Sequence, residues 1–197
     1  MAGNRVFRLW LMDQLRTNEN NRWDAGVRQT IEDTLRGHFQ KVLASQLCAF
    51  GRIEIAWEGI GFLRAQHGYA DTDIVLHFLD SVRESILRNR FSVNLKSGSG
   101  HSGATQLTPE GMLSEIHVWE NENGTDARLG KLIGNLAFHE AMHNKLDADP
   151  RFPGDIHALH AKQAGGLSEP VISSNSDLKA DELLRMAPAM ARVIPQF

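Results

Sequence analysis

Several features that would place this chain in a special class of protein are missing from its 197 residues. It has a single cysteine, Cys48, so no disulfide can form within the chain and a disulfide-stapled scaffold is excluded. Apolar residues make up 42% and charged residues 23%, as in ordinary globular domains and unlike disordered or collagen-like chains. We therefore expect a single folded domain, 1–197, in which Cys48 is a small buried hydrophobe.

The chain also lacks an excess of charge of one sign. Its 21 lysine and arginine residues and 24 aspartate and glutamate residues give a formal net charge of −3. No basic excess points to nucleic acid or to an anionic membrane. No apolar run reaches the roughly 18 residues of a membrane span, and residues 1–16 lack the apolar core and cleavage site of a signal peptide. If the protein acts outside its cell of origin, we expect delivery by another route.

Hydrophobic periodicity predicts an α+β domain. The predicted helices cover 23–46, part of 81–90, a segment from Thr125 or Asp126 to about 145, and 178–191, bent near Pro188. The predicted strands cover 52–57, 73–79, 91–95 and 112–119. The glycine- and serine-rich stretch 96–104 predicts a surface loop. Within the single domain, these patterns separate a helical N-terminal portion, 1–70, from a core, 71–197.

Histidine is what the sequence has in abundance. There are nine, and four of them lie between His139 and His160. His139-Glu140-Ala141-Met142-His143 matches the pattern H-E-x-x-H. Residues four apart on a helix lie on one face, one turn apart, so His139 and His143 can present two nitrogens to one Zn²⁺. The spacing predicts a zinc site.

The residues around the motif support this interpretation. Leu129, Leu132 and Leu136 precede the two histidines at alternating spacings of three and four, and so continue one stripe of one helix. Glu140 lies about 100° around the helix from His139, where it can flank a metal without ligating it. It can take a proton from a zinc-bound water, whose pKa zinc lowers toward about 7, and pass it to the leaving amine. The motif predicts zinc-dependent hydrolysis of peptide bonds.

A catalytic zinc site has a third protein ligand and one open position. Two candidates stand level: His157, which follows a loop long enough to fold back over the metal, and Glu182 on the predicted C-terminal helix. The weaker candidates are Asp149, His160 and Glu169. The glycine pair Gly165-Gly166 either lets the chain pass close to the site or forms a plain turn. The sequence leaves the third ligand open.

The predicted strand that includes 115–119 comes shortly before the motif helix. In zinc peptidases of this general build, an edge strand beside the active-site helix holds an extended peptide by backbone hydrogen bonds. The strand is therefore a candidate substrate-binding edge, and the alternative is a purely structural strand.

The order of these blocks resembles a known family. His139-Glu140-Ala141-Met142-His143-Asn144-Lys145, followed by Asp155-Ile156-His157 and Gly165-Gly166-Leu167, is similar to the zinc metallopeptidase toxin domain at the C-terminus of some type VI secretion spike proteins of the valine–glycine-repeat type. The resemblance covers about residues 70–197. It implies a zincin-like fold, with a small mixed sheet, a long active-site helix and an irregular, partly helical C-terminal part.

The same resemblance implies roles for particular residues. His139 and His143 would be zinc ligands, Glu140 the catalytic acid and base, and Glu182 the third ligand by position. It also implies an antibacterial effector that is injected into the periplasm of a neighbouring cell, with an immunity protein and a secretion spike as partners. The chain begins with Met1 and carries no spike domain, so we expect either an excised domain or a stand-alone cargo.

Two rival functions use the same residues. The first is a zinc hydrolase or amidase that acts on cell-wall peptides instead of proteins. The second is a non-catalytic interaction domain whose histidines bind metal structurally. In the second case, Glu140 would have no chemical role.

Overall fold

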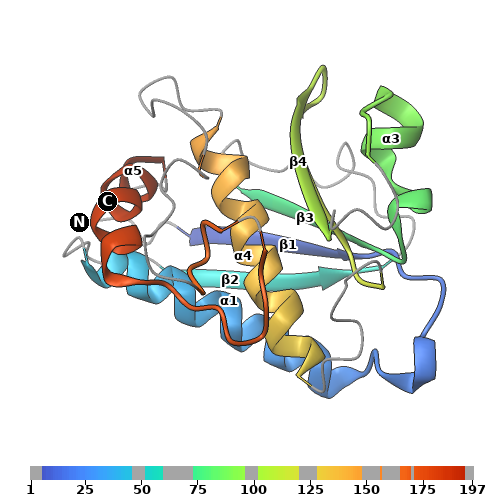
Figure 1. The fold of residues 1–197 in the computed structure, drawn as a ribbon, viewed down its shortest axis with the longest axis horizontal. Helices are drawn as coiled ribbons and strands as arrows, with labels where there is room; N and C mark the ends of the chain where they lie inside the picture. Colours follow the sequence, from blue (N-terminus) through green and yellow to red (C-terminus); the bar gives the residue numbers. More distant parts are fainter. Residues whose placement is uncertain are drawn as a thin grey trace.

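A computed structural model describes residues 6–45, 52–59, 73–95, 102–119, 128–147, 156, 165–169 and 171–193. Within these ranges the chain forms one five-stranded mixed sheet with helices packed against it (Figure 1). The strands are β1 (Val6–Asp13), β2 (Arg52–Glu58), β3 (Ile74–Leu79), β4 (Gly103–Thr108) and β5 (Gly111–His117). The helices are α1 (Ala25–Ser45), α3 (Ile86–Phe91), α4 (Leu129–Leu146) and α5 (Ala180–Val193), with short 3₁₀ turns at Glu19–Asn21 and Val82–Glu84. The predicted α+β class is confirmed.

The strand order across the sheet is β2-β1-β3-β5-β4. All neighbouring strands pair in parallel except β4, which runs antiparallel to β5. β5 therefore lies inside the sheet, between β3 and β4, and β4 forms one edge. The prediction that the strand at 115–119 is an edge strand was therefore wrong. The edge strand beside the motif helix is β4.

The predicted division at residue 70 cuts through this sheet. β1 pairs with β2 on one side and with β3 on the other, so residues before and after 70 share one sheet. The N-terminal portion thus contributes two strands beside its helix. None of the described helices is both long and apolar enough to cross a membrane.

Most predicted elements are found close to their expected positions. The helices predicted at 23–46 and 178–191 are α1 and α5, and the latter contains Pro188. The strands predicted at 52–57, 73–79 and 112–119 are β2, β3 and β5. The expected helix start at Thr125 or Asp126 lies outside the described residues, and α4 is described from Leu129.

Two expectations about local structure were wrong in whole or in part, and one strand was not predicted. The strand predicted at 91–95 does not form, because α3 runs to Phe91 and Ser92, at φ 58°, turns the chain in the left-handed conformation. Residues 96–101 of the predicted loop 96–104 lie outside the described residues, and its last two residues belong to β4 instead. β1 was missed altogether: it lies inside the sheet with Leu9 and Leu11 fully buried, and such strands lack a clean alternation of polar and apolar residues.

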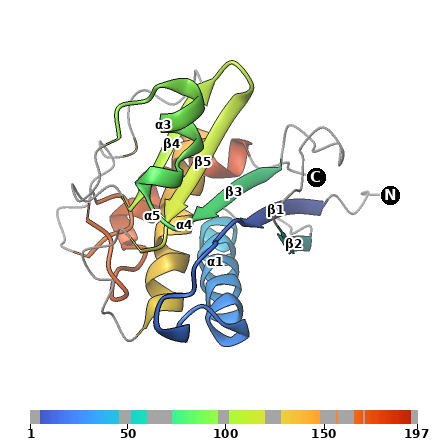
Figure 2. The ribbon, with the colours of Figure 1, turned by 90° about the vertical axis from the view of Figure 1, so that its right-hand side faces the viewer.

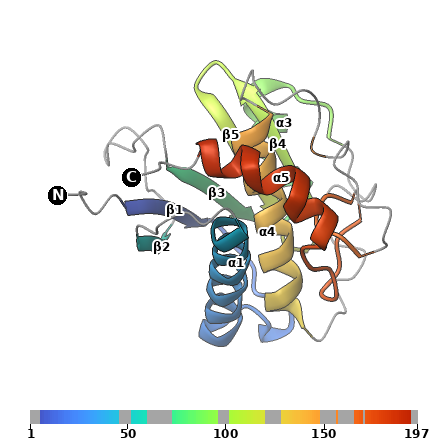
Figure 3. The same ribbon diagram turned by 90° about the vertical axis from the view of Figure 1, so that its left-hand side faces the viewer.

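α1 and α4 pack against each other on one face of the sheet, as Figures 2 and 3 show from opposite sides. Between this helix pair and the sheet lies a single core of apolar side chains. Its largest fully buried members are Phe39, Phe78, Phe138, Leu9, Leu11, Ile31, Leu35, Ile74, Leu76 and Ile116. The core therefore fixes α4, the helix that carries the H-E-x-x-H motif, against both α1 and the sheet.

Two glycines allow the close approach of these helices. A Cβ atom placed on Gly134 would lie 2.6 Å from the Thr34 Cβ, and one on Gly130 would lie 2.7 Å from the Thr30 Cβ. Both distances are far below van der Waals contact, so a side chain at either glycine would push α4 away from α1.

Gly134→Ala is expected to lower the free energy of unfolding by about 1–3 kcal/mol, because the core is already filled and the added methyl group must force the helices apart. The matched control is Gly37→Ala in α1, where nothing lies within 4 Å of an added Cβ. That change should stabilise the protein by about 0.4–1 kcal/mol, because alanine favours helix and restricts the unfolded chain. Urea unfolding of both variants measures the difference, and equal stability would show that the helices do not meet at Gly134.

Candidate metal centre

The H-E-x-x-H motif lies in the second half of α4, where Glu140 and Asn144 hydrogen-bond to side chains of β4 and β5. His139 and Glu140 are almost completely buried, and His143 is partly exposed. The ring centroids of His139 and His143 are 4.9 Å apart, with their planes at 82°. The two imidazoles thus lie next to each other on one side of the helix, as the sequence predicted.

A hydrogen bond at Nδ1 orients each of these rings. His139 Nδ1 donates to the carbonyl oxygen of Leu167 at 2.7 Å, and His143 Nδ1 donates to Oδ2 of Asp147 at 2.6 Å. A carbonyl and a carboxylate can only accept, so the proton of each neutral ring resides on Nδ1 and the lone pair on Nε2. Metal-binding histidines in proteins are held in the same way. The pair fits a metal that is ligated by two Nε2 atoms.

Sequence reasoning missed both acceptors. Asp147 follows His143 by four residues, and this helical spacing could have identified it. Leu167 contributes a main-chain atom, for which no side-chain signal exists. Its neighbours Gly165-Gly166 were the available sign that the chain passes close to the site.

Glu140 projects from α4 toward the edge strand. Its Oε2 accepts a hydrogen bond from Thr105 Oγ1 at 2.7 Å. A Cβ atom on Gly103 would overlap the Glu140 side chain, so glycine at this position leaves the carboxylate in its place against β4. Burial raises the pKa of Glu140, and the nearby His143 and the Thr105 hydrogen bond act in the opposite direction. A carboxylate with a raised pKa is suited to accepting a proton and giving it up again.

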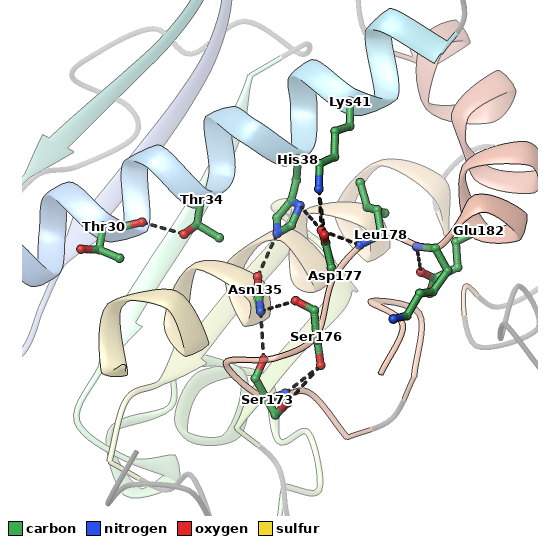
Figure 4. A network of polar contacts seen from close by, with 11 residues as sticks. Thr30, Thr34, His38, Lys41, Asn135, Ser173, Ser176, Asp177, Leu178 and Glu182 are labelled. Carbon is green, nitrogen blue, oxygen red and sulfur yellow. Dashed lines mark hydrogen bonds and ion pairs between the residues drawn. The ribbon is translucent and has the colours of Figure 1, made fainter. Parts of the chain in front are cut away.

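Glu182, one of the two leading candidates for a third ligand, is buried and occupied by other partners. Its Oε1 accepts from the N–H and the Oγ of Ser168, both at 2.6 Å, and its Oε2 accepts from the N–H of Lys179 at 2.8 Å. The bond to Lys179 caps the start of α5, in whose first turn Glu182 lies (Figure 4). Ser168 follows Leu167, so Glu182 anchors the segment whose carbonyl orients His139.

No group of three histidine, cysteine, aspartate or glutamate side chains that could hold a metal occurs among the described residues. His157, the other leading candidate, lies outside them, as do Asp149 and His160. Glu169 accepts a hydrogen bond from the N–H of Gly165 at 3.0 Å. The identity of the third ligand therefore stays a prediction.

The chain matches no protein-family model, no curated protein and no solved structure. Its function is therefore inferred from the residues of the site and their geometry.

A second polar cluster lies on α4 one turn before His139 (Figure 4). Asn135 Nδ2 donates to the carbonyl oxygens of Ser173 and Ser176 at 2.9 and 2.8 Å. Its Oδ1 accepts from His38 Nε2 of α1 at 2.8 Å. The cluster ties α1, α4 and the segment before α5 together behind the motif, and sequence reasoning did not identify it.

His38 has an unusual protonation equilibrium because of this position. Burial lowers its pKa from 6.5 to about 4, and the hydrogen bond to Asn135 only partly compensates. The Nδ1 atom of its ring lies 3.6 Å from Asp177 Oδ1, and Lys41 binds the same carboxylate at 2.8 Å. His38 is therefore neutral at physiological pH.

Proposed function

We propose that this protein is a zinc-dependent metallopeptidase in which His139 and His143 hold the metal and Glu140 is the general base. The pair of Nδ1 hydrogen bonds carries the proposal, because the acceptors on Leu167 and Asp147 select the tautomer in which Nε2 carries the lone pair that a metal requires. Zinc bound there would supply a Lewis acid that polarises the scissile carbonyl and acidifies water.

Glu140 would move the proton. As general base it accepts a proton from the attacking water, and as general acid it delivers that proton to the nitrogen of the leaving amine. Its position supports both steps, because it neighbours the two histidines on α4 and yet turns its carboxylate toward β4. Its burial favours the protonated form that must persist between the two steps.

The edge strand supports a polypeptide substrate. β4 borders α4 and, among the described strands, pairs only with β5, so an extended peptide can pair with its outer backbone edge. A sheet edge beside the motif helix is also what we expect of a zincin-like fold, and we propose that fold for this chain.

The metal content of the purified protein tests this proposal. After incubation with zinc and removal of the excess, mass spectrometry of metals should find about one zinc per chain. His139→Ala and His143→Ala should each lose it, because removing one of the two imidazoles weakens binding too far for the ion to survive removal of the excess zinc. A wild-type protein that binds no zinc, or that binds zinc equally well without the two histidines, contradicts the proposal.

The same measurement on His157→Ala and Glu182→Gln addresses the third ligand. We expect Glu182→Gln to retain zinc with an affinity reduced by about 10–100-fold, the usual effect of disturbing a residue that orients a ligand. Complete loss of zinc from His157→Ala, with the thermal midpoint unchanged, would identify that residue as the ligand. Complete loss from a folded Glu182→Gln protein would instead restore Glu182 as the ligand.

Parallel assays on casein and on purified peptidoglycan separate the peptidase from the rival cell-wall amidase, because both would use the same metal and base. The role as an antibacterial effector with an immunity protein stays a prediction from the resemblance. It is tested by exporting the chain to the periplasm of a Gram-negative host and comparing viability with that of the Glu140→Gln variant.

A further inference from the structure

Within the described part of the chain, the contacts of the Glu140 carboxylate with other elements come from β4. Among the residues that the structure describes, Thr105 is the one side chain that hydrogen-bonds to it, through Oε2. Gly103, two residues earlier on β4, lies against the same carboxylate without a side chain of its own. The edge strand thus combines a close backbone approach with a single hydroxyl directed at Glu140.

Thr105 Oγ1 lies near three oxygen atoms but has one proton to donate. Glu140 Oε2 is at 2.7 Å, Ser114 Oγ at 2.8 Å and the Glu140 carbonyl oxygen at 3.2 Å. An ionised carboxylate is the strongest acceptor of the three and cannot donate. The proton of Thr105 therefore goes to Oε2, and the Ser114 hydroxyl must donate to Thr105.

Asn144 completes this chain of donors. Its Nδ2, which can only donate, lies 3.0 Å from Ser114 Oγ. Ser114 thus accepts from Asn144, and its own proton is available for Thr105. With Glu140 ionised, only one direction satisfies every bond: from Asn144 to Ser114, then to Thr105, then to Glu140. Hydrogen bonds aligned in this way strengthen one another in a buried setting.

The fold keeps these four side chains in place. Thr105 and Ser114 are paired across β4 and β5, and Glu140 and Asn144 are one turn apart on α4. Ser114, Glu140 and Asn144 are all buried. The chain of donors therefore starts and ends on α4 and passes through both strands of the hairpin that faces it.

We propose that Thr105 is a positioning residue that, with Ser114 and Asn144 behind it, fixes the orientation of the Glu140 carboxylate for the transfer of the proton from the attacking water. The inference rests on the proposed function, because it assigns a role in the proton transfer by Glu140. The hydrogen-bond chain itself exists whether or not the protein is an enzyme, so the two can fail separately.

The variants that test this inference differ by single groups. Thr105→Val keeps the shape and the β-branching of the side chain but removes the hydroxyl, and Thr105→Ser restores the hydroxyl. Ser114→Ala breaks the chain one link further back. The matched control is Thr30→Val, the same chemical change in α1, where the hydroxyl donates only to Gly26 of its own helix. Thermal unfolding and zinc content establish that each variant is folded and loaded.

The first readout does not depend on activity. In metal-free protein, the ¹³C resonance of the Glu140 side-chain carboxyl, assigned by its absence from Glu140→Gln, should shift in Thr105→Val and by a smaller amount in Ser114→Ala. It should stay in place in Thr30→Val and close to its wild-type position in Thr105→Ser. A resonance that is unmoved in Thr105→Val overturns the inference.

The second readout is the hydrolysis of fluorescently labelled casein by the zinc-loaded protein. Thr105→Val should lower kcat by about ten- to a hundredfold with KM within about twofold, and Thr105→Ser should recover kcat to within about threefold of wild type. An unchanged kcat, or an equal loss in Thr105→Ser, overturns the positioning role. Wild-type protein that neither binds zinc nor cleaves casein overturns the proposed function together with that role, and the carboxyl resonance then decides whether the chain of donors exists.

Discussion

Glu140→Gln is expected to lower kcat for peptide hydrolysis by about 10²–10⁴-fold while one zinc stays bound to each chain. Glutamine has the size and shape of glutamate and can still accept the hydrogen bond from Thr105, so the packing around position 140 should survive. An amide cannot take the proton of the attacking water at neutral pH. The metal is held by His139 and His143, whose Nδ1 partners are unaffected by the change.

The experiment compares kcat and zinc content in the same preparations. Glu84→Gln is a suitable control, because Glu84 is a partly exposed residue that pairs with Arg16 away from the motif. The control should keep wild-type activity. Activity of Glu140→Gln within about threefold of wild type, with zinc bound, would remove Glu140 from the mechanism and favour an interaction domain that binds metal structurally.

Acidification is expected to destabilise the protein through His38. Its pKa is about 4 in the folded protein and 6.5 in the unfolded chain. Between about pH 4 and pH 6.5, His38 binds a proton in the unfolded chain but stays neutral in the folded protein. The stabilisation is therefore complete above pH 6.5, falls as the pH drops and is lost at about pH 4, which amounts to about 3 kcal/mol.

Urea unfolding at pH 7 and at pH 4.5 measures this effect. Other groups also titrate in that range, so the informative quantity is the difference in pH dependence between wild type and His38→Gln. A glutamine amide can still donate to Asn135 but has no proton to gain near pH 6. The variant should lose less stability on acidification than wild type does, and an identical loss in both proteins would show that His38 is accessible to protons when folded.

The hydrogen bond between His38 and Asn135 indicates which part of the fold this pH effect should disturb first. His38 donates to Asn135, which holds the carbonyl groups of Ser173 and Ser176 and stands one turn before His139. Protonation of His38 would place a charge in this buried junction between α1, α4 and the segment before α5. We therefore expect acid to loosen α4 behind the motif before it disturbs the strands.

The sequence alone determined those features that depend on near neighbours in the chain. H-E-x-x-H needs only the helical repeat to place His139, Glu140 and His143, and the apolar stripe before it predicts the helix that carries them. α1, β2, β3, β5 and α5 were likewise predicted, because each has a local apolar pattern that one face of a helix or strand must bury.

Only the tertiary structure decided which segments meet around that motif. β4 has no alternation of buried apolar and exposed polar residues, so no local pattern marks Thr105 and Gly103 as the neighbours of Glu140. Glu182 has the sequence position expected of a metal ligand, yet in the folded protein its carboxylate accepts hydrogen bonds from Ser168 and Lys179. His38 and Asn135 are 97 residues apart and become partners because α1 packs on α4. Such contacts depend on long-range packing, whereas periodicity and spacing report only on residues a few positions apart.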